Sequence, residues 1–252
     1  MGFGEETFFK KFLPRLLFAM EKLCVLDGRL SCAASFVRQG SVVCDVGTDH
    51  AYLPVNLIQR GIAKRAVACD INEGPLDRAR KSAAKFGVTD RIRFVLADGL
   101  DGVEPEKDGV NDIVVCGMGG ELIARIVDAS AYTRNPDVRL ILQPMTCAPE
   151  LRQYLWDNGF CIMEERLCEA AGKIYTCMHV RYDGETRVYT PAELILGRYH
   201  IENRAPLFDE YAKTAIRRMQ TQITGMKKGG LDTAKEEADL ASVETAVSGG
   251  TI

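Results

Sequence analysis

The sequence lacks any apolar run approaching the roughly 20 residues that a membrane span needs. The basic and apolar stretch at 8–20 is interrupted by Pro14 and Arg15, and no small-residue cleavage site follows, which argues against a signal peptide. Residues 1–25 are predicted to be an N-terminal extension. Three interpretations of its first 19 residues stay open: a loosely ordered extension, sequence upstream of a start at Met20, or a packed helix. We expect a cytoplasmic protein without a membrane partner.

Metal-ligand spacing is also missing, although the chain has nine cysteines. No CxxC pair and no cluster of Cys with His is present. Five of the cysteines lie in short apolar runs typical of strands, namely Cys44, Cys69, Cys116, Cys161 and Cys177. The pattern predicts small buried hydrophobic residues in a reducing compartment, and no structural metal.

Positive charge is scarce overall, because the net charge is −3. That balance opposes a broadly basic surface for nucleic acid, since phosphate binding requires Lys and Arg. The distribution is uneven, however. The segment 190–228 is net basic and includes Arg217 and Arg218, whereas the tail after Gly230 is acidic. That segment could therefore supply phosphate contacts to a nucleic acid.

Short apolar runs alternate with helical patterns from Ser41 to about Asp183. Because the runs are apolar throughout, they predict a parallel sheet that is covered by helices on both faces. The predicted strands are 42–46, 66–70, 93–97, 112–117 and 139–144, and the predicted helices are 53–60, 75–86, 120–129 and 149–157.

The last two strands break this alternation. The runs 159–167 and 173–183 are only a few residues apart, which suits an antiparallel hairpin. A doubly wound α/β sheet that ends in such a hairpin is the Rossmann-like variant of class I methyltransferases, and it favours S-adenosylmethionine over NAD. The predicted domain covers 26–186, and 187–252 is predicted to be a C-terminal α-helical hairpin whose second helix spans about 232–247.

Acidic residues follow three successive strands of the predicted sheet. Asp45 ends the first strand, Asp70 ends the second, and Asp98, followed by Gly99, ends the third. In open α/β sheets the ligand lies beyond these carboxyl ends, where an acidic side chain accepts hydrogen bonds from ribose hydroxyls. Asp70 is assigned to the ribose and Asp98 to the adenine amine, and Gly47 permits close approach of the backbone. These residues form the predicted cofactor site.

The fourth predicted strand is followed by the glycine-rich stretch GMGG at 117–120. In methyltransferases this position faces the reacting base, so Gly117 is assigned to the cofactor and Met118 to the substrate. Adenine-N6 methyltransferases carry an acidic-or-Asn-Pro-Pro-aromatic tetrad here. The absence of that tetrad counts against N6 chemistry.

Taken together, several segments resemble the bacterial tRNA (adenine-22-N1)-methyltransferase family, TrmK. They are RL at 29–30, DVGTDHAYLP (45–54), DINEGPL (70–76), ADGL (97–100), GMGGELI (117–123), LILQP (140–144), LR at 151–152 and GKIY (172–175). The match in order and spacing covers about 26–183. The resemblance implies S-adenosylmethionine as methyl donor, tRNA as substrate, and a C-terminal helical element that helps to hold the RNA. Met145 replaces the Asn usual in the family, and Thr176 replaces the usual Glu.

N1 of adenine carries an in-plane lone pair, so its attack on the methyl group needs alignment and stabilisation of the developing positive charge. Asp49 is the candidate catalytic residue, because it projects from the loop beside the methyl donor. Alternatively, Asp49 and His50 only hold this loop. Tyr52 is assigned to stack on the base or to form the pocket wall, and Arg29 to bind the methionine carboxylate or an RNA phosphate.

The basic helical segment is assigned to phosphate contacts through Arg217 and Arg218, with a solvated helix face as the alternative. Two other functions stay open at this point: methylation of another RNA base, and a cofactor-binding RNA module without turnover. A nicotinamide oxidoreductase is opposed by the sparse glycine loop and the terminal hairpin.

Overall fold

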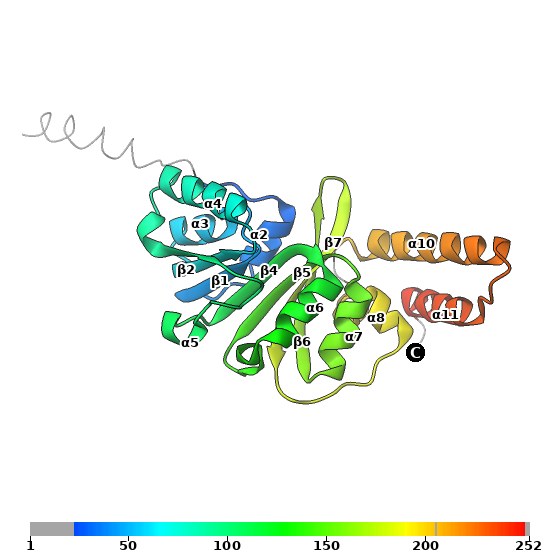
Figure 1. Ribbon diagram of the computed structural model, residues 1–252. Coiled ribbons are helices and arrows are strands. Elements are labelled where there is room, and N and C mark those ends of the chain that lie inside the picture. Colours follow the sequence, from blue (N-terminus) through cyan, green and yellow to red (C-terminus); the bar gives the residue numbers. More distant parts are fainter. Residues whose placement is uncertain (1–22, 205, 250–252) are drawn as a thin grey trace, which may run out of the picture.

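A seven-stranded sheet forms the centre of the protein in the computed structural model, which describes residues 23–204 and 206–249 (Figure 1). The strand order is β3-β2-β1-β4-β5-β7-β6, and the pairs among β1 to β5 are parallel. The strands are β1 (Ser41–Val46), β2 (Ala63–Asp70), β3 (Ile92–Leu96), β4 (Asp112–Gly119), β5 (Arg139–Thr146), β6 (Phe160–Ala170) and β7 (Lys173–Tyr182). The predicted α/β class and strand series are confirmed.

Two cores cover the two faces of this sheet. Successive residues of a strand point to opposite faces, so Val43 belongs to one core and Cys44 to the other. The first core contains α2 (Gly28–Ala34), α3 (Tyr52–Gln59) and α4 (Glu73–Lys85). The second contains α6 (Gly120–Ala129) and α7 (Ala148–Asp157), with the short α5 (Pro105–Asp108) near the amino ends of the strands. Figure 1 shows these helices on the two sides of the sheet.

The predicted helices match α3, α4, α6 and α7 closely, whereas short helices such as α2 were not predicted. Leu76, Ala79 and Ala83 form the buried face of α4, as their spacing predicts. The seven-residue α2 is too short for a clear period, and it begins at a cap that the sequence analysis missed: the Asp27 carboxylate accepts the Leu30 N–H. Residues 1–22 of the predicted extension lie outside the described residues, while Cys24 is buried and bonded through its backbone to α3.

The antiparallel hairpin is confirmed. β7 pairs antiparallel with both β5 and β6. Ala171 and Gly172 both have positive φ, at 49° and 69°, and they form a two-residue turn of the kind that matches the twist of hairpin strands. The hairpin therefore extends past the end of β5 and reaches the C-terminal helices.

The C-terminal part contains the predicted helical hairpin and two short helices that were not predicted. α10 (Phe208–Lys228) and α11 (Ala234–Ser248) form the hairpin, which projects from the sheet domain in Figure 1. The short helices α8 (Pro191–Leu196) and α9 (Arg198–Asn203) precede it, and Thr190 with Glu193 forms a capping box at α8. These helices share a small core of their own. The domain division at 186/187 stays a prediction.

A buried ion pair connects the two parts. Arg152 of α7 and Glu165 of β6 are both 0% exposed, and Arg152 Nη2 lies 2.8 Å from Glu165 Oε1. Arg152 Nη1 donates to the Leu194 carbonyl of α8 at 2.7 Å. Thr176 Oγ1 adds a hydrogen bond to Glu165 at 3.2 Å and lies 3.1 Å from His200 Nε2 of α9. Thr176, one of the two residues that differ from the family pattern, therefore lies where the sheet contacts the C-terminal helices. We call this contact, formed by Arg152, Glu165, Thr176 and His200, the joint. None of the described helices is long and apolar enough to cross a membrane.

Candidate active site

The carboxyl ends of the parallel strands bring the three predicted acidic residues to one edge of the sheet. Asp45 pairs in register with Ala68 of β2 and Val114 of β4, so it lies at the point where the strand order reverses. Asp70 ends β2, and Asp98 lies two residues beyond β3. Such a reversal is where ligands bind in this architecture. The three predicted acidic residues therefore lie at the same edge of the sheet, as the sequence predicted, and their binding roles stay a prediction.

The three carboxylates have different surroundings. Asp45 is 7% exposed, and burial raises its pKa to about 6, with the nearby Asp70 charge adding to the effect. Asp70 Oδ1 accepts the Asn72 N–H at 2.8 Å. Asp98 is exposed, and its carboxylate has no hydrogen bond from any residue that the structure describes. The edge thus presents one buried acid, Asp45, whose ionised form a cationic ligand would stabilise. Asp70 and Asp98 are two hydrogen-bond acceptors closer to solvent.

Glycines allow the strand ends to approach one another. Gly47 has φ of 77°, and a Cβ placed there would lie 2.1 Å from Met118 Cε, so the Met118 side chain covers this glycine. Gly117 has φ of 81°, and its N–H donates to Gln143 Oε1 at 3.2 Å. Gly99 also has a positive φ, of 60°. The glycine-rich stretch at 117–120 continues β4 as an irregular strand end to Gly119, and the buried Gln143 of β5 braces it.

The predicted catalytic residue is held by a partner that the sequence did not suggest. Asp49 is 60% exposed, and its carboxylate accepts from Arg78 Nε of α4 at 3.0 Å. His50 Nε2 lies 3.5 Å from the other carboxylate oxygen. His50 stacks on Tyr52, with ring centroids 4.9 Å apart. The loop therefore forms one chain of contacts from α4 to α3, and a catalytic role for Asp49 stays a prediction.

Arg29 lies on the other side of the edge, above the end of β4. Its Nη1 is 2.9 Å from Met145 Sδ, and its Nη2 is 2.7 Å from Asp27 Oδ2. Its guanidinium also lies over the Tyr175 ring, 5.7 Å from the centroid. The same Nη1 would lie 3.9 Å from a Cβ at Gly117. Arg29 is thus placed beside Met145, the residue that departs from the family pattern.

A groove of about 730 Å³ extends from Met145 to the C-terminal helices. Its walls are the end of β5, the β6–β7 turn region, and the facing sides of α10 and α11. Met145, Tyr175, Tyr211 and Met219 give it apolar and aromatic surface. Its charged lining residues are Glu150, Glu169, Glu210, Glu236, Asp239, Lys173, Arg218 and Lys235. The groove therefore carries more acidic than basic side chains.

The structure separates two arginines that the sequence analysis treated as one patch. Arg218 lines the groove, whereas Arg217 is exposed and is not among its lining residues. Adjacent residues on a helix point in directions about 100° apart, so the two side chains face different surroundings. Neither forms an ion pair with any residue among 23–204 and 206–249.

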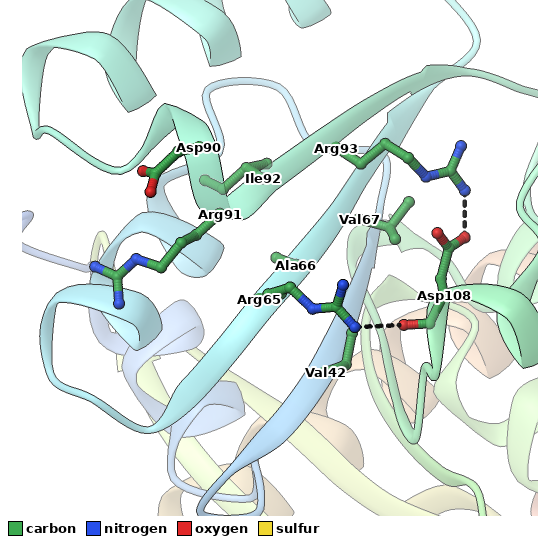
Figure 2. A pocket seen from close by; sticks show the side chains of 9 residues that line it. All are labelled: Val42, Arg65, Ala66, Val67, Asp90, Arg91, Ile92, Arg93 and Asp108. Atoms are coloured by element: carbon green, nitrogen blue, oxygen red, sulfur yellow. Dashed lines mark hydrogen bonds and ion pairs between the residues drawn. The ribbon is translucent and has the colours of Figure 1, made fainter.

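A second cavity, of about 360 Å³, lies at the opposite edge of the sheet, at the amino ends of β1, β2 and β3. Figure 2 shows Arg65 and Arg93 reaching toward Asp108 there. It is remote from the strand ends that carry Asp45, Asp70 and Asp98. Within the described ranges, no group of three or more His, Cys, Asp or Glu is placed to hold a metal ion.

Strand order, strand-end acids and the glycine-lined end of β4 together define the protein as an S-adenosylmethionine-dependent methyltransferase of class I. That cofactor carries cationic, hydroxyl and amine groups, which match the acceptors at the edge. A methyltransferase-domain family model matches residues 26–178. The chain belongs to the tRNA (adenine(22)-N(1))-methyltransferase family.

Individual relatives support this assignment. The chain is 32% identical over 172 residues to the tRNA (adenine(22)-N(1))-methyltransferase of Bacillus subtilis, covering 68% of this chain and 71% of that protein. A Streptococcus pneumoniae structure described as a tRNA (m1A22) methyltransferase in complex with S-adenosyl-L-methionine is 33% identical, with a TM-score of 0.76 and coverage of 86% and 97%. The B. subtilis TrmK crystal structure is 26% identical, with a TM-score of 0.74 and coverage of 88% and 95%.

Four residues of the site were not assigned a role by the sequence analysis: Asp27, Arg78, Gln143 and Tyr175. Gln143 had a local signal, because it is a lone amide in the apolar run RLILQP. Tyr175 was noticed only as part of a motif. Arg78 and Asp27 are ordinary exposed-helix and cap residues, and only the tertiary structure brings them to the site.

Proposed function

We propose that this protein transfers a methyl group from S-adenosylmethionine to N1 of an adenine in tRNA, at position 22 on the D-loop side, in the cytoplasm. The observation that carries the proposal is the arrangement of Asp45, Asp70 and Asp98 around the switch point, beside the irregular end of β4. The B. subtilis relative supports it, because its name gives the same tRNA position and the same nitrogen as the methylated site.

The cofactor supplies an electrophilic methyl group on a sulfonium, and the chain supplies its binding groups. Asp70 accepts from the ribose hydroxyls, Asp98 from the adenine amine, and ionised Asp45 provides negative charge near the cationic end. Gly117 leaves room for the ligand along the backbone, whereas Met118 closes over Gly47 and the Ile126 side chain packs beside Gly99. The Met118 side chain is flexible, so it can move to admit the cofactor.

The target base enters from the side of Arg29 and Met145. As N1 bonds to the methyl carbon, the carbon–sulfur bond breaks and the ring becomes positively charged. Asp49 stabilises this charge and accepts the N6 proton afterwards, and Arg78 holds its carboxylate until the base arrives. Arg29, beside Tyr175 and the groove, is placed to contact an RNA phosphate at the entrance.

The groove receives the RNA next to the target. Its five acidic lining residues repel phosphates, so the RNA backbone is expected beside its three basic lining residues, Lys173, Arg218 and Lys235. The aromatic surface of Tyr175 and Tyr211 suits an unpaired base. This arrangement accommodates an adenine that has been extruded from the tRNA core, at a cost of about a few kcal/mol.

The test is methyl transfer from tritiated S-adenosylmethionine to unmodified tRNA transcripts, with nucleoside analysis of the product. We expect 1-methyladenosine in a transcript with adenine at position 22 and none in a transcript with guanine there. Equal labelling of both transcripts would mean that another base is the target. If the protein binds the cofactor but transfers no label to either transcript, its function would be that of a non-catalytic RNA-associated module.

A further inference from the structure

Helix α2 lies lengthwise on strand β6. At one end, Gly28 contacts the strand so closely that a Cβ there would lie 2.0 Å from the Glu169 carbonyl oxygen. At the other end, Arg166 Nη1 donates to Ser35 Oγ at 2.6 Å. The helix therefore runs antiparallel to the strand from Glu169 to Arg166, and Cys32 lies between these two contacts.

Three cysteines meet in this interface. Cys168 lies opposite Tyr175, so both point to the same face of the hairpin, and Cys177 points to that face as well because it is two residues beyond Tyr175. Cys32 packs against the core cluster that contains Cys177, and it lies between the two contacts that hold α2 on the Arg166–Glu169 stretch of β6. Cys168 and Cys177 are buried, whereas Cys32 is partly exposed. Only the helix thiol of this group is therefore open to small solutes.

The surroundings of Cys32 favour its thiolate. Hydrogen bonds from Cys168 and Cys177, with the positive charge of Arg166, hold the pKa of Cys32 well below its usual value despite partial burial. By contrast, the pKa of Cys116 is raised by burial. Cys32 therefore differs from the inert buried thiols that the sequence predicted throughout the chain.

We propose that Cys32 is a peroxide-reactive thiol and that Cys168 converts its oxidised form into a Cys32–Cys168 disulfide. In the first step the Cys32 thiolate attacks one oxygen of hydrogen peroxide, which gives a sulfenic acid and hydroxide. In the second step the Cys168 sulfur attacks the Cys32 sulfur, a new S–S bond forms, the S–O bond breaks, and water leaves with the Cys168 proton. Overall, two thiols lose two hydrogen atoms and one peroxide becomes two waters.

The buried Cys168 can take part because its environment changes after the first step. Its hydrogen bond to the Cys32 thiolate, followed by burial, raises the pKa of Cys168 in the reduced protein. A sulfenic acid is uncharged, so the negative charge that raised the pKa is gone when Cys168 must react. Cys177 is fully buried, and a hydrogen bond from its thiol lowers the pKa of Cys32.

The disulfide would act on the RNA side of the active site. Arg29 precedes Cys32 by one helical turn, so the two share a face of α2, and Arg29 lies over Tyr175, the residue opposite Cys168. A covalent link one turn away constrains Arg29 on Tyr175 and Met145. The acids of β1 to β3 are on other strands. We expect oxidation to lower tRNA methylation severalfold and to leave the affinity for S-adenosylhomocysteine unchanged.

The test is treatment of the full-length protein with one molar equivalent of hydrogen peroxide, followed by non-reducing digestion and mass spectrometry. We expect a cross-linked peptide pair containing Cys32 and Cys168, its disappearance in Cys32→Ser, and its persistence in Cys161→Ser. In Cys168→Ser, a Cys32 sulfenic acid should instead be trapped by a dimedone-type reagent. Thermal melting of each variant establishes that it is folded.

Several results would overturn the proposal. Oxidation of Cys147 or Cys161 as fast as Cys32 would show that Cys32 has no special reactivity. A disulfide between Cys32 and Cys177 would show that Cys177, and not Cys168, is the second thiol. If the cross-linked protein methylates tRNA at the full rate, and a reductant does not change that rate, the disulfide does not act on Arg29.

Discussion

The two sides of the active site are built in different ways. The cofactor side consists of strand ends from a short stretch of sequence, because Asp45, Asp70 and Asp98 follow three consecutive strands. The proposed RNA side combines α2, the end of β5, the β6–β7 hairpin and α10, which are far apart in the chain. The first side is fixed by the sheet, whereas the second depends on how the C-terminal helices are joined to it. This difference predicts that substitutions will separate the two binding functions.

The largest effect is expected at the joint. Arg152→Ala leaves the Glu165 carboxylate buried without its cationic partner, and breaking such a pair typically destabilises a protein by about 3–5 kcal/mol. Urea unfolding should detect the change. The double variant Arg152→Met with Glu165→Leu should recover much of the stability, because no buried charge is left. Equal instability of both variants would mean that the charge is not the cause.

A second large effect concerns Asp45, which is uncharged in the folded protein below a pH of about 6. Its folded pKa lies above the value of 3.8 that it has when exposed, so its ionisation destabilises the cofactor-free fold as pH rises through about 6. Asp45→Asn should therefore stabilise the cofactor-free protein at pH 7.5 by up to about 3 kcal/mol, measured by urea unfolding. The gain should vanish below pH 4.

The same ionisation should control cofactor affinity in the opposite sense. S-adenosylmethionine carries a cationic sulfonium and binds the ionised acid, so its affinity should fall up to about tenfold per pH unit below pH 6. In Asp45→Asn the affinity should be weak and independent of pH in this range. A wild-type affinity that stays constant from pH 5 to 7.5 would contradict this role of Asp45.

Asp49 is proposed to act on the substrate and not to bind the cofactor, and its variant tests this assignment. Asp49→Ala should lower kcat about 100-fold, within the range of positioned catalytic groups, and leave the cofactor Kd unchanged. Arg78→Ala should cause a smaller loss, because the Asp49 carboxylate remains. Asp77→Ala, an exposed acid that pairs with Arg80 on α4, is the control with normal kcat. A raised cofactor Kd with normal kcat would make Asp49 a cofactor residue.

The smallest effect distinguishes Arg217 from Arg218. Arg218→Ala should reduce the slope of log affinity for tRNA against log salt by about one unit, as expected for one lost phosphate contact. Arg217→Ala, at the adjacent position outside the groove, should change the slope less. Filter binding at several salt concentrations measures both. Equal changes would place the RNA across the outer face of α10 as well.

The cofactor side was predictable from the sequence because its signals are local. Each acidic residue follows an apolar run, and parallel strands must end at one edge. The contacts of the RNA side had no such signal. Arg29 meets Met145 across 116 positions, and Arg78 reaches Asp49 only because α4 packs beside the first loop. The thiol cluster is similar, since nothing in the spacing of Cys32, Cys168 and Cys177 shows that α2 lies on the hairpin.

The most direct test of separate cofactor and RNA sides is a crossed binding measurement on two variants and two ligands. Calorimetry with S-adenosylhomocysteine and filter binding with tRNA would be applied to Asp70→Ala and Arg218→Ala. We predict that Asp70→Ala loses cofactor affinity and keeps tRNA affinity, whereas Arg218→Ala does the reverse. A loss of both affinities in either variant, with the fold intact by circular dichroism, would contradict the separation of the two sides.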